Sequence, residues 1–317
     1  MEYFTLNERF ARQAADLVIS NYRSVCAGNR AFMADAFTSP VLAGDLLEWA
    51  GKGGSVVAHE NGELQGFVAG RFIEFYQSKK TFYSPEWAHG VAGPVPDRVL
   101  NGMYAWLTRS GQVDDSAVHI FGVYASEVAM KTAIANLEFG VHMMDGVLSF
   151  PPQPIPRELP AGVTIRAAES GDIPAIIDLD RQLWTHLAQP PVSLPLDLAN
   201  YPENRSKYVI PREGSYISVA EIDRVIVGFV SCRLGLQETR GLRNEAVPGI
   251  NGAFVDIDHR DNDVGQAMLD DIFRWAKELK APFVTVDFET TNVEGSGFWR
   301  SREFEPVAFG MTRRLPG

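Results

Sequence analysis

The sequence predicts an α/β protein built from two tandem copies of one unit, and three observations support this prediction. A stretch with five prolines at 151–160 divides the chain of 317 residues almost in half. The two halves repeat one pattern of apolar residues and glycines. The second half contains a compact strand–turn–helix pattern over 253–280. Because the chain exceeds the usual size of one domain, we expect domains at 1–150 and 161–317, joined by a semi-rigid linker at 151–160.

The internal repeat is most evident in a predicted β-hairpin. Val57-Ala58 is followed, nine residues after Val57, by Gly66-Phe67-Val68, and Val219-Ala220 is followed at the same distance by Gly228-Phe229-Val230. The offset between the copies is 162 residues, from Val57 to Val219. Each copy has a polar turn between two β-prone runs, as in a hairpin. A helix with Trp106 in the first copy matches a helix with Trp275 in the second.

The second copy has a clear order of elements. Apolar residues at helical spacing predict helices, and short β-prone runs bounded by turn residues predict strands. In order, we expect a strand at 163–167, a helix at 170–187, a proline-rich excursion at 189–202, a short helix at 203–209, the hairpin, a long loop at 235–251, a strand at 253–257, a helix at 264–279, a strand at 283–289, a short helix at 294–301 and a last strand at 307–313, which closes the domain.

Composition and charge restrict the class of protein. The net charge of −11 argues against a nucleic-acid binder, which needs a basic face. Cys26 and Cys232, the two cysteines, lie in no metal or redox motif, which favours a reducing compartment. The N-terminus lacks the pattern of a secretory signal, and the longest apolar run, at 225–232, is too short for a bilayer. We therefore expect a cytoplasmic globular protein without a membrane partner.

The motifs of the second half resemble those of the GNAT superfamily of N-acetyltransferases. Arg260 and Val264-Gly265 follow the fourth strand, Asn292 follows the fifth, and Glu303-Phe304 precedes the sixth. The resemblance covers 162–314 well and the first half more loosely, through the repeat. Two tandem domains of this kind, one of them degenerate, resemble mycothiol-synthase-type acetyltransferases. The resemblance implies that each copy is a mixed, mostly antiparallel sheet flanked by helices, with a splay between strands 4 and 5.

The resemblance also implies a function, the transfer of an acetyl group from acetyl-CoA to an amine. In the family, acetyl-CoA lies in the splay like an added strand, and its pyrophosphate binds the amides at the start of the following helix. The acceptor would be a small-molecule amine or a peptide, and the protein a monomer or homodimer. The residues that the resemblance assigns to acetyl-CoA are Val255 and Ile257 beside pantetheine, Arg260, Val264, Gly265, Gln266 and Ala267 at the pyrophosphate, and Asn292 and Trp299 as further contacts.

Three departures from the family pattern favour an alternative, a GNAT-fold protein that binds or regulates without catalysis. Asp263 replaces a glycine of the motif, and its side chain can either cap the helix, occupying the same amides, or point to solvent. Trp299 replaces the tyrosine that protonates the leaving thiolate in many members, and indole does not titrate. In the first copy, Pro94 and Pro96 fall on the corresponding turn and have no N–H groups to offer a phosphate, while Val91 aligns with Arg260.

The chemistry needs a base for the amine proton, and the sequence offers several carboxylates. Asp287 and Glu289 share one face of a predicted strand, where a pair of acids would suit a cationic amine. Each of these carboxylates can also be a solvated surface residue. No histidines have metal-ligand spacing, and no phosphate-binding P-loop or Ser-His-Asp signature is present in the sequence. The candidates for the base are Glu221, Asp256, Asp287 and Glu289.

Overall fold

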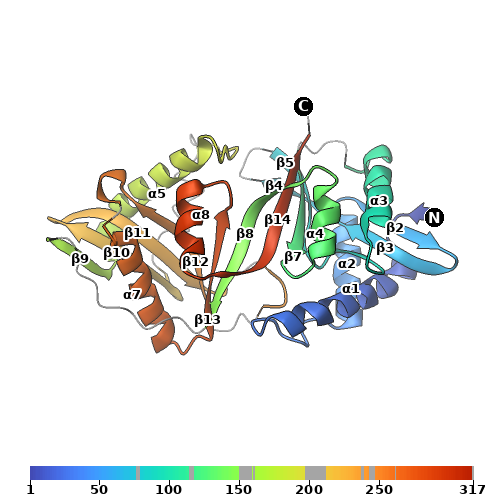
Figure 1. The fold of residues 1–317 in the computed structure, drawn as a ribbon, viewed down its shortest axis with the longest axis horizontal. Coiled ribbons are helices and arrows are strands. Elements are labelled where there is room, and N and C mark those ends of the chain that lie inside the picture. The colour runs from blue at the N-terminus through green and yellow to red at the C-terminus, as the bar shows by residue number, and fades with distance from the viewer. Residues whose placement is uncertain are drawn as a thin grey trace. The chain divides into compact units, whose positions relative to one another are not determined.

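The computed structural model divides the chain into two compact units. It describes residues 1–75, 79–113, 118–149, 159, 161–196, 212–236, 239–242, 247–260 and 262–315. Unit 1 comprises Met1–Asp145, Thr239–Leu242 and Pro306–Gly317, and unit 2 comprises Gly146–Glu238 and Arg243–Glu305. Most of the predicted linker at 151–160 and the predicted short helix at 203–209 lie outside the described residues. In both units helices pack on sheets, as the sequence predicts (Figure 1).

Unit 1 contains two groups of paired strands. One sheet has the order β1-β2-β3-β6 and is antiparallel throughout. In the other group the order is β4-β5-β7-β14, and β5 runs parallel to β7. The elements of unit 1 are β1 (Glu2–Phe4), α1 (Glu8–Gly28), α2 (Ser39–Gly51), β2 (Ser55–Glu60), β3 (Glu63–Ala69), β4 (Arg71–Phe75), β5 (Lys79–Ser84), β6 (His89–Val91), α3 (Asp97–Arg109), β7 (Val118–Tyr124), α4 (Val128–Ala135), most of β8 (Gly140–Ser149) and nearly all of β14 (Glu305–Arg314).

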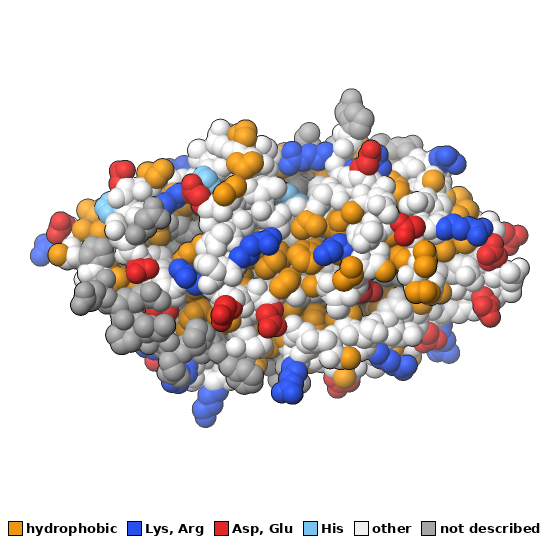
Figure 2. Space-filling model, in the orientation of Figure 1, with side chains coloured by type: hydrophobic (Ala, Val, Ile, Leu, Met, Phe, Trp, Pro, Cys, Tyr) orange, Lys and Arg blue, Asp and Glu red, His pale blue; other side chains and the backbone are white. Residues whose placement is uncertain are grey.

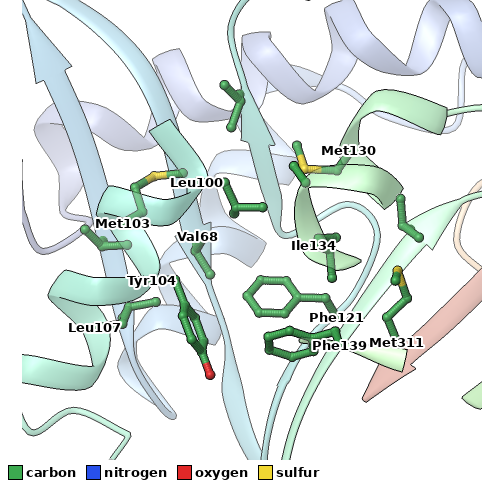
Figure 3. Close-up of a cluster of buried hydrophobic side chains, with 14 of the residues drawn as sticks. Val68, Leu100, Met103, Tyr104, Leu107, Phe121, Met130, Ile134, Phe139 and Met311 are labelled. Carbon is green, nitrogen blue, oxygen red and sulfur yellow. The ribbon is translucent and has the colours of Figure 1, made fainter. Parts of the chain in front are cut away.

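The core of unit 1 is rich in aromatic side chains. Leu100, Met103, Tyr104 and Leu107 recur on one face of α3 and meet Phe121 of β7 with its neighbours (Figure 3). Edge-to-face packing of Phe121 on Phe139, with ring centroids 5.3 Å apart, fits the preference of aromatic pairs. The helix therefore packs through a continuous apolar face, as its spacing predicts.

A four-residue segment, Thr239–Leu242, belongs to unit 1 although its neighbours in sequence belong to unit 2. The Arg240 amide donates to Oε1 of buried Glu86 at 2.7 Å, and the Arg240 guanidinium pairs with Asp45 at 2.6 Å. The guanidinium also lies 4.6 Å from the centre of the Trp87 ring, within cation–π range. Burial raises the pKa of the Glu86 carboxyl to about 8. Sequence reasoning did not predict this segment, because the loop around it lacks any periodic pattern.

Unit 2 contributes five neighbouring strands to a mixed sheet, in the order β13-β12-β11-β10-β9. Its strands pair antiparallel except β12 and β13, which run parallel. Adjacent residues of β11 point to opposite faces: Gly228 lies against Met268 of α7, whereas Phe229 packs with Ile176 of α5. The two helices therefore cover opposite faces. Unit 2 contains β9 (Val163–Ala167), η1 (Ser170–Asp172), α5 (Ile173–Ala188), β10 (Ser215–Ile222), β11 (Val225–Leu234), β12 (Pro248–Val255), η3 (Ile257–His259), α7 (Val264–Glu278), β13 (Phe283–Glu289) and α8 (Val293–Arg300).

The structure confirms the repeat in backbone detail. The β2–β3 hairpin has a register shift after Ala58, and the β10–β11 hairpin has one after Ala220, at the same offset of 162 residues. A Cβ on Gly66 would lie 3.1 Å from the Met103 side chain, and one on Gly228 would lie 3.0 Å from that of Met268. Glycine thus permits the same close approach of helix to strand in both copies.

The bounds of the central strand differ from the prediction, because β12 begins at Pro248, inside the predicted loop at 235–251, and ends at Val255, before Ile257. Two further details also differ from the predictions. Val91 pairs with Gly66 as Val255 pairs with Gly228, so Val91 corresponds to Val255 and not to Arg260. The predicted strand at 307–313 exists as β14, but it pairs with β7 and belongs to unit 1 instead of closing the second domain. Strand patterns in a sequence do not specify the partner strand, which explains the second error.

Candidate active site

The central feature of unit 2 is an incompletely paired strand. The pairs between β12 and β13 are Gly249 with Thr285 and Ile250 with Val286, and the described parts of the two strands diverge beyond them. On its other edge, β12 stays paired with β11 as far as Val255. Residues 252–255 therefore present one edge that β13 does not cover, and this is the splay expected between the fourth and fifth strands.

The start of α7 lies close to this edge. Asp263 precedes the helix in a left-handed conformation, with φ of 57°, and its side chain makes no capping hydrogen bond. A motif glycine would adopt this conformation easily, and aspartate is among the residues that tolerate it. The predicted capping box is therefore not formed. The Ala267 amide donates to the Asp263 carbonyl at 2.9 Å, so the amides that precede it, at 264–266, are those that a helix start presents to a ligand.

A pocket of about 760 Å³ connects the open edge of β12 with the start of α7. Its lining includes most of the residues that the sequence assigns to acetyl-CoA, namely Val255, Ile257, Arg260, Val264, Gly265, Gln266, Asn292 and Trp299. Ala267 is not part of the lining. A Cβ on Gly265 would lie 3.6 Å from both Val255 and Phe298, so a larger side chain there would extend between these two walls.

Arg260 crosses from the turn to the end of β12. Its Nε donates to the Val255 carbonyl at 2.9 Å, and its guanidinium pairs with Glu294 of α8. The guanidinium also lies 5.1 Å from the centre of the Phe254 ring. Arg260 thus holds the last carbonyl of the open edge and keeps a positive charge beside the helix start.

Asn292 and His186 form a polar contact inside the pocket. The Asn292 Oδ1 accepts the Gly295 amide at 3.2 Å and so caps α8, and the same oxygen lies 3.3 Å from Nε2 of His186. His186 comes from α5, three residues after Leu183, which also lines the pocket. Sequence reasoning did not single out His186, and the available signal was its position one turn after Leu183, on the same helix face.

Trp299 serves as part of the pocket wall and of the local core. Its side chain is buried, and its ring packs edge-to-face on Phe298 and Phe304, with centroid distances of 4.9 and 5.8 Å. Indole offers one N–H donor and no titrating proton, so this position supplies shape and not acid catalysis.

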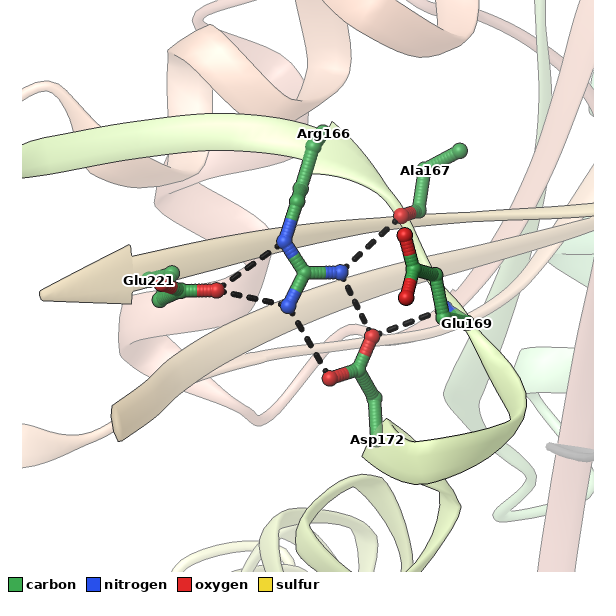
Figure 4. A network of polar contacts seen from close by, with 5 residues as sticks. All are labelled: Arg166, Ala167, Glu169, Asp172 and Glu221. Carbon is green, nitrogen blue, oxygen red and sulfur yellow. Dashed lines mark hydrogen bonds and ion pairs between the residues drawn. The ribbon is translucent and has the colours of Figure 1, made fainter. Parts of the chain in front are cut away.

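Glu221 belongs to an ion-pair network that joins β9, β10 and η1 (Figure 4). The Arg166 guanidinium donates to Glu221 at 2.6 Å and to Asp172 at 2.6 Å. Hydrogen bonding by Arg166 lowers the pKa of the Asp172 carboxyl. The network fastens the start of α5 to the sheet and occupies the Glu221 carboxylate.

The other candidate carboxylates also lie outside the pocket lining. Asp256 caps η3 by accepting the Asp258 amide at 3.0 Å, and Asp287 is exposed on β13. Glu289 is half-buried at the end of the same strand. The lining residues do not include Glu221, Asp256, Asp287 or Glu289. The structure therefore brings together all of the predicted cofactor residues except Ala267, and none of the predicted bases.

On the face shown in Figure 2, acidic and basic side chains are interspersed. Among the described residues, no cluster of His, Cys, Asp and Glu has the arrangement of a metal site. Within the same residues, no helix has the length and apolarity to cross a membrane.

Comparison with known proteins agrees with this geometry. Residues 178–304 match the family model for acetyltransferases of the GNAT family. A GCN5-related N-acetyltransferase from Sphaerobacter thermophilus is 13% identical over 100% of this chain and 96% of its own, with a TM-score of 0.62. A tandem GNAT protein of the clavulanic acid biosynthesis pathway is 15% identical over 100% and 99%, with a TM-score of 0.50. No curated protein sequence matches. Residues 178–304 are thus similar in sequence to GNAT acetyltransferases, and the whole length of the chain has the fold of GNAT proteins.

Proposed function

We propose that unit 2 binds acetyl-CoA in this pocket and transfers the acetyl group to an amine of a small molecule or peptide. One observation carries the proposal, namely the open edge of β12 at 252–255 beside the uncapped start of α7. An extended pantetheine arm needs unpaired backbone groups along a strand, and a pyrophosphate needs helix amides. Both features line one pocket, and the residues present therefore fit the ligand.

The chain's own groups have separate roles in this proposal. The open edge of β12 orients the pantetheine arm, although its Val255 carbonyl already accepts Arg260 Nε and Ile257 lies beyond the strand in η3. The first amides of α7 hold the pyrophosphate. The Val255 N–H would polarise the acetyl carbonyl, as donors aimed at a developing negative charge do. Arg260 adds positive charge beside the phosphates. Attack by the amine then requires a group that removes its proton.

We assign no acetyl-CoA site to unit 1. There, β5 pairs with one edge of β7 and β14 pairs with the other, so both edges of this strand are occupied. The turn before α3 also contains Pro94 and Pro96, which lack amide donors. The alternative of a protein that only binds or regulates loses one of its supports, because Asp263 does not cap α7.

Isothermal titration calorimetry with acetyl-CoA tests the proposal. We expect one site per chain, and we expect Gly265→Glu to weaken binding on the order of 100-fold or more, since its side chain would extend between Val255 and Phe298 and add negative charge beside the phosphates. Gly171→Glu is the matched control, because it adds the same charge in the same unit at an exposed position with open space around it. Absence of heat with the unmodified protein would end the proposal.

A further inference from the structure

The hydrogen bonds around Asn292 determine which nitrogen of His186 carries a proton. The Gly295 amide can only donate, so the Asn292 atom that accepts it at 3.2 Å must be the carbonyl oxygen. That oxygen also lies 3.3 Å from His186 Nε2 and is itself unable to donate. Nε2 must therefore hold the hydrogen, and the neutral ring keeps its lone pair on Nδ1.

His186 also lines the pocket that we propose for acetyl-CoA. Its helix, α5, packs against β11 and β12, and His186 with Leu183 forms a wall of the pocket that also contains the open edge of β12. The His186 residue is half-buried and contacts Asn292 through Nε2. It is therefore held in position while part of it stays accessible from the pocket.

We propose that His186 Nδ1 is the base that accepts the amine proton during acetyl transfer, an inference that rests on the function proposed above. In this step the amine nitrogen forms a bond to the acetyl carbon, and the carbon–sulfur bond breaks. Nδ1 takes one proton from the nitrogen. The sulfur leaves with the bonding electrons and takes a proton from solvent, so that the products are the acetamide and free CoA.

The other groups of the pocket are less suited to this role. Glu294 is paired with Arg260, and Asp263 stands at the phosphate end of the pocket, before α7. His259 Nδ1 faces Asp256 at 3.6 Å in the turn that follows β12. Besides His186, the titratable or charged residues of the pocket lining are His259, Arg260, Asp263, Glu294 and Arg302.

The first test is the tautomer itself, read from the ring-nitrogen NMR shifts of the full chain at neutral pH. We expect the His186 signal, assigned by its loss in His186→Gln, to show hydrogen on Nε2 in the unmodified protein. Hydrogen on Nδ1 would overturn the inference. Because the measurement needs no substrate, its result is separate from that of the acetyl-CoA titration.

The second test is acetyl transfer from acetyl-CoA to ethanolamine, glycinamide or tryptamine, using whichever reacts fastest. His186→Gln should keep acetyl-CoA affinity within about twofold but lose roughly 10²-fold to 10³-fold in kcat/KM, the usual contribution of a positioned base. The rate ratio of unmodified protein to variant should shrink as the pH falls, because a protonated imidazole cannot accept a proton.

His259→Gln is the control from the same pocket, and it should keep the pH dependence of the unmodified protein. A pH-independent ratio for His186→Gln, or an unchanged rate, would contradict the role of His186. Normal acetyl-CoA binding without transfer to any of the three amines would also overturn it, while leaving the binding site in place.

Discussion

The two units of this chain contain the same strand–turn–helix arrangement in two different states. In unit 2 the strand β12 separates from β13, and a pocket opens between its edge and α7. In unit 1 the corresponding strand β6 ends at Val91, and the neighbouring edge of β7 is taken by β5. In unit 2 the strand edge next to α7 is therefore open to a ligand, whereas in unit 1 the equivalent space is filled by the β4–β5 pair. We call this space the slot. Filling it adds core packing to unit 1 and leaves no room there for a ligand.

The turns that precede α3 and α7 also differ, and again only the turn in unit 2 suits a bound phosphate. Between Val91 and the start of α3 at Asp97 the chain has a short connection with two prolines, whereas the connection from Val255 to Val264 is longer and includes η3. Only the longer turn provides Arg260 and a left-handed residue immediately before the helix. The following predictions test this comparison, from the largest expected effect to the smallest.

The largest effect should come from truncating Phe82, which is fully buried in the core of unit 1 where unit 2 has a pocket. Phe82→Ala should lower the free energy of unfolding by about 3–5 kcal/mol, because deletion of a buried ring leaves a cavity. Phe254→Ala is the matched change in unit 2, where the ring lines the pocket and is half-buried. Phe254→Ala should lower the free energy of unfolding, measured by urea denaturation, clearly less than Phe82→Ala does. Equal losses for the two variants would contradict the claim that unit 1 is packed where unit 2 has a pocket.

A pH effect of intermediate size should distinguish unit 1. Burial raises the folded-state pKa of Glu86 to about 8, above the ordinary value near 4.5, so its favourable contribution is present at low pH and is lost as the pH rises toward 8. Between pH 6.5 and 8 this group should lower stability by about 2 kcal/mol, at roughly 1.4 kcal/mol per pH unit. Urea midpoints for the unmodified protein should fall over this range and those of Glu86→Gln should fall less. Parallel curves would contradict the burial of an ionisable carboxyl at this position.

A smaller effect should follow from Asp263→Asn. The amide tolerates the left-handed conformation as well as the acid does, but it removes a negative charge next to the proposed phosphate site. Acetyl-CoA should bind about fivefold more tightly at low salt, as expected for loss of about 1 kcal/mol of repulsion, and added salt should reduce the gain. An unchanged dissociation constant at low salt would place the phosphates elsewhere.

The smallest effect should come from restoring amide donors in unit 1. The double variant Pro94→Ala and Pro96→Ala gives this turn two N–H groups, but β5 still occupies the edge of β7. We therefore expect calorimetry to show one acetyl-CoA per chain, as for the unmodified protein. A second site would show that the prolines, and not the hairpin, prevent binding in unit 1.

Much of the fold was predictable from local sequence patterns. Val163–Ala167 forms the strand expected from its residues, and Pro174 lies in the first turn of α5, where a proline fits. The repeat predicted two hairpins with matching geometry, and both have the same bulge. These features depend on residues close together in the sequence, so a pattern specifies them.

Other features were not predictable because they depend on contacts between distant residues. The candidate bases were chosen as acids on predicted strands, but the partner of Glu221 is Arg166, which lies 55 residues earlier. His186 meets Asn292 across 106 residues, and no local signal marks that contact. The backbone conformation of Asp263 decided between capping and an open helix start, and residue type alone left both possible.

Hydrogen–deuterium exchange of the full chain with and without acetyl-CoA tests the difference between the units most directly. We predict slower exchange at 252–257 and at 264–266 when acetyl-CoA is bound, and no change at 79–84 or 89–91. Unaltered exchange in both segments of unit 2 at saturating acetyl-CoA, or protection that appears in the segments of unit 1, would contradict the assignment of the open slot to unit 2.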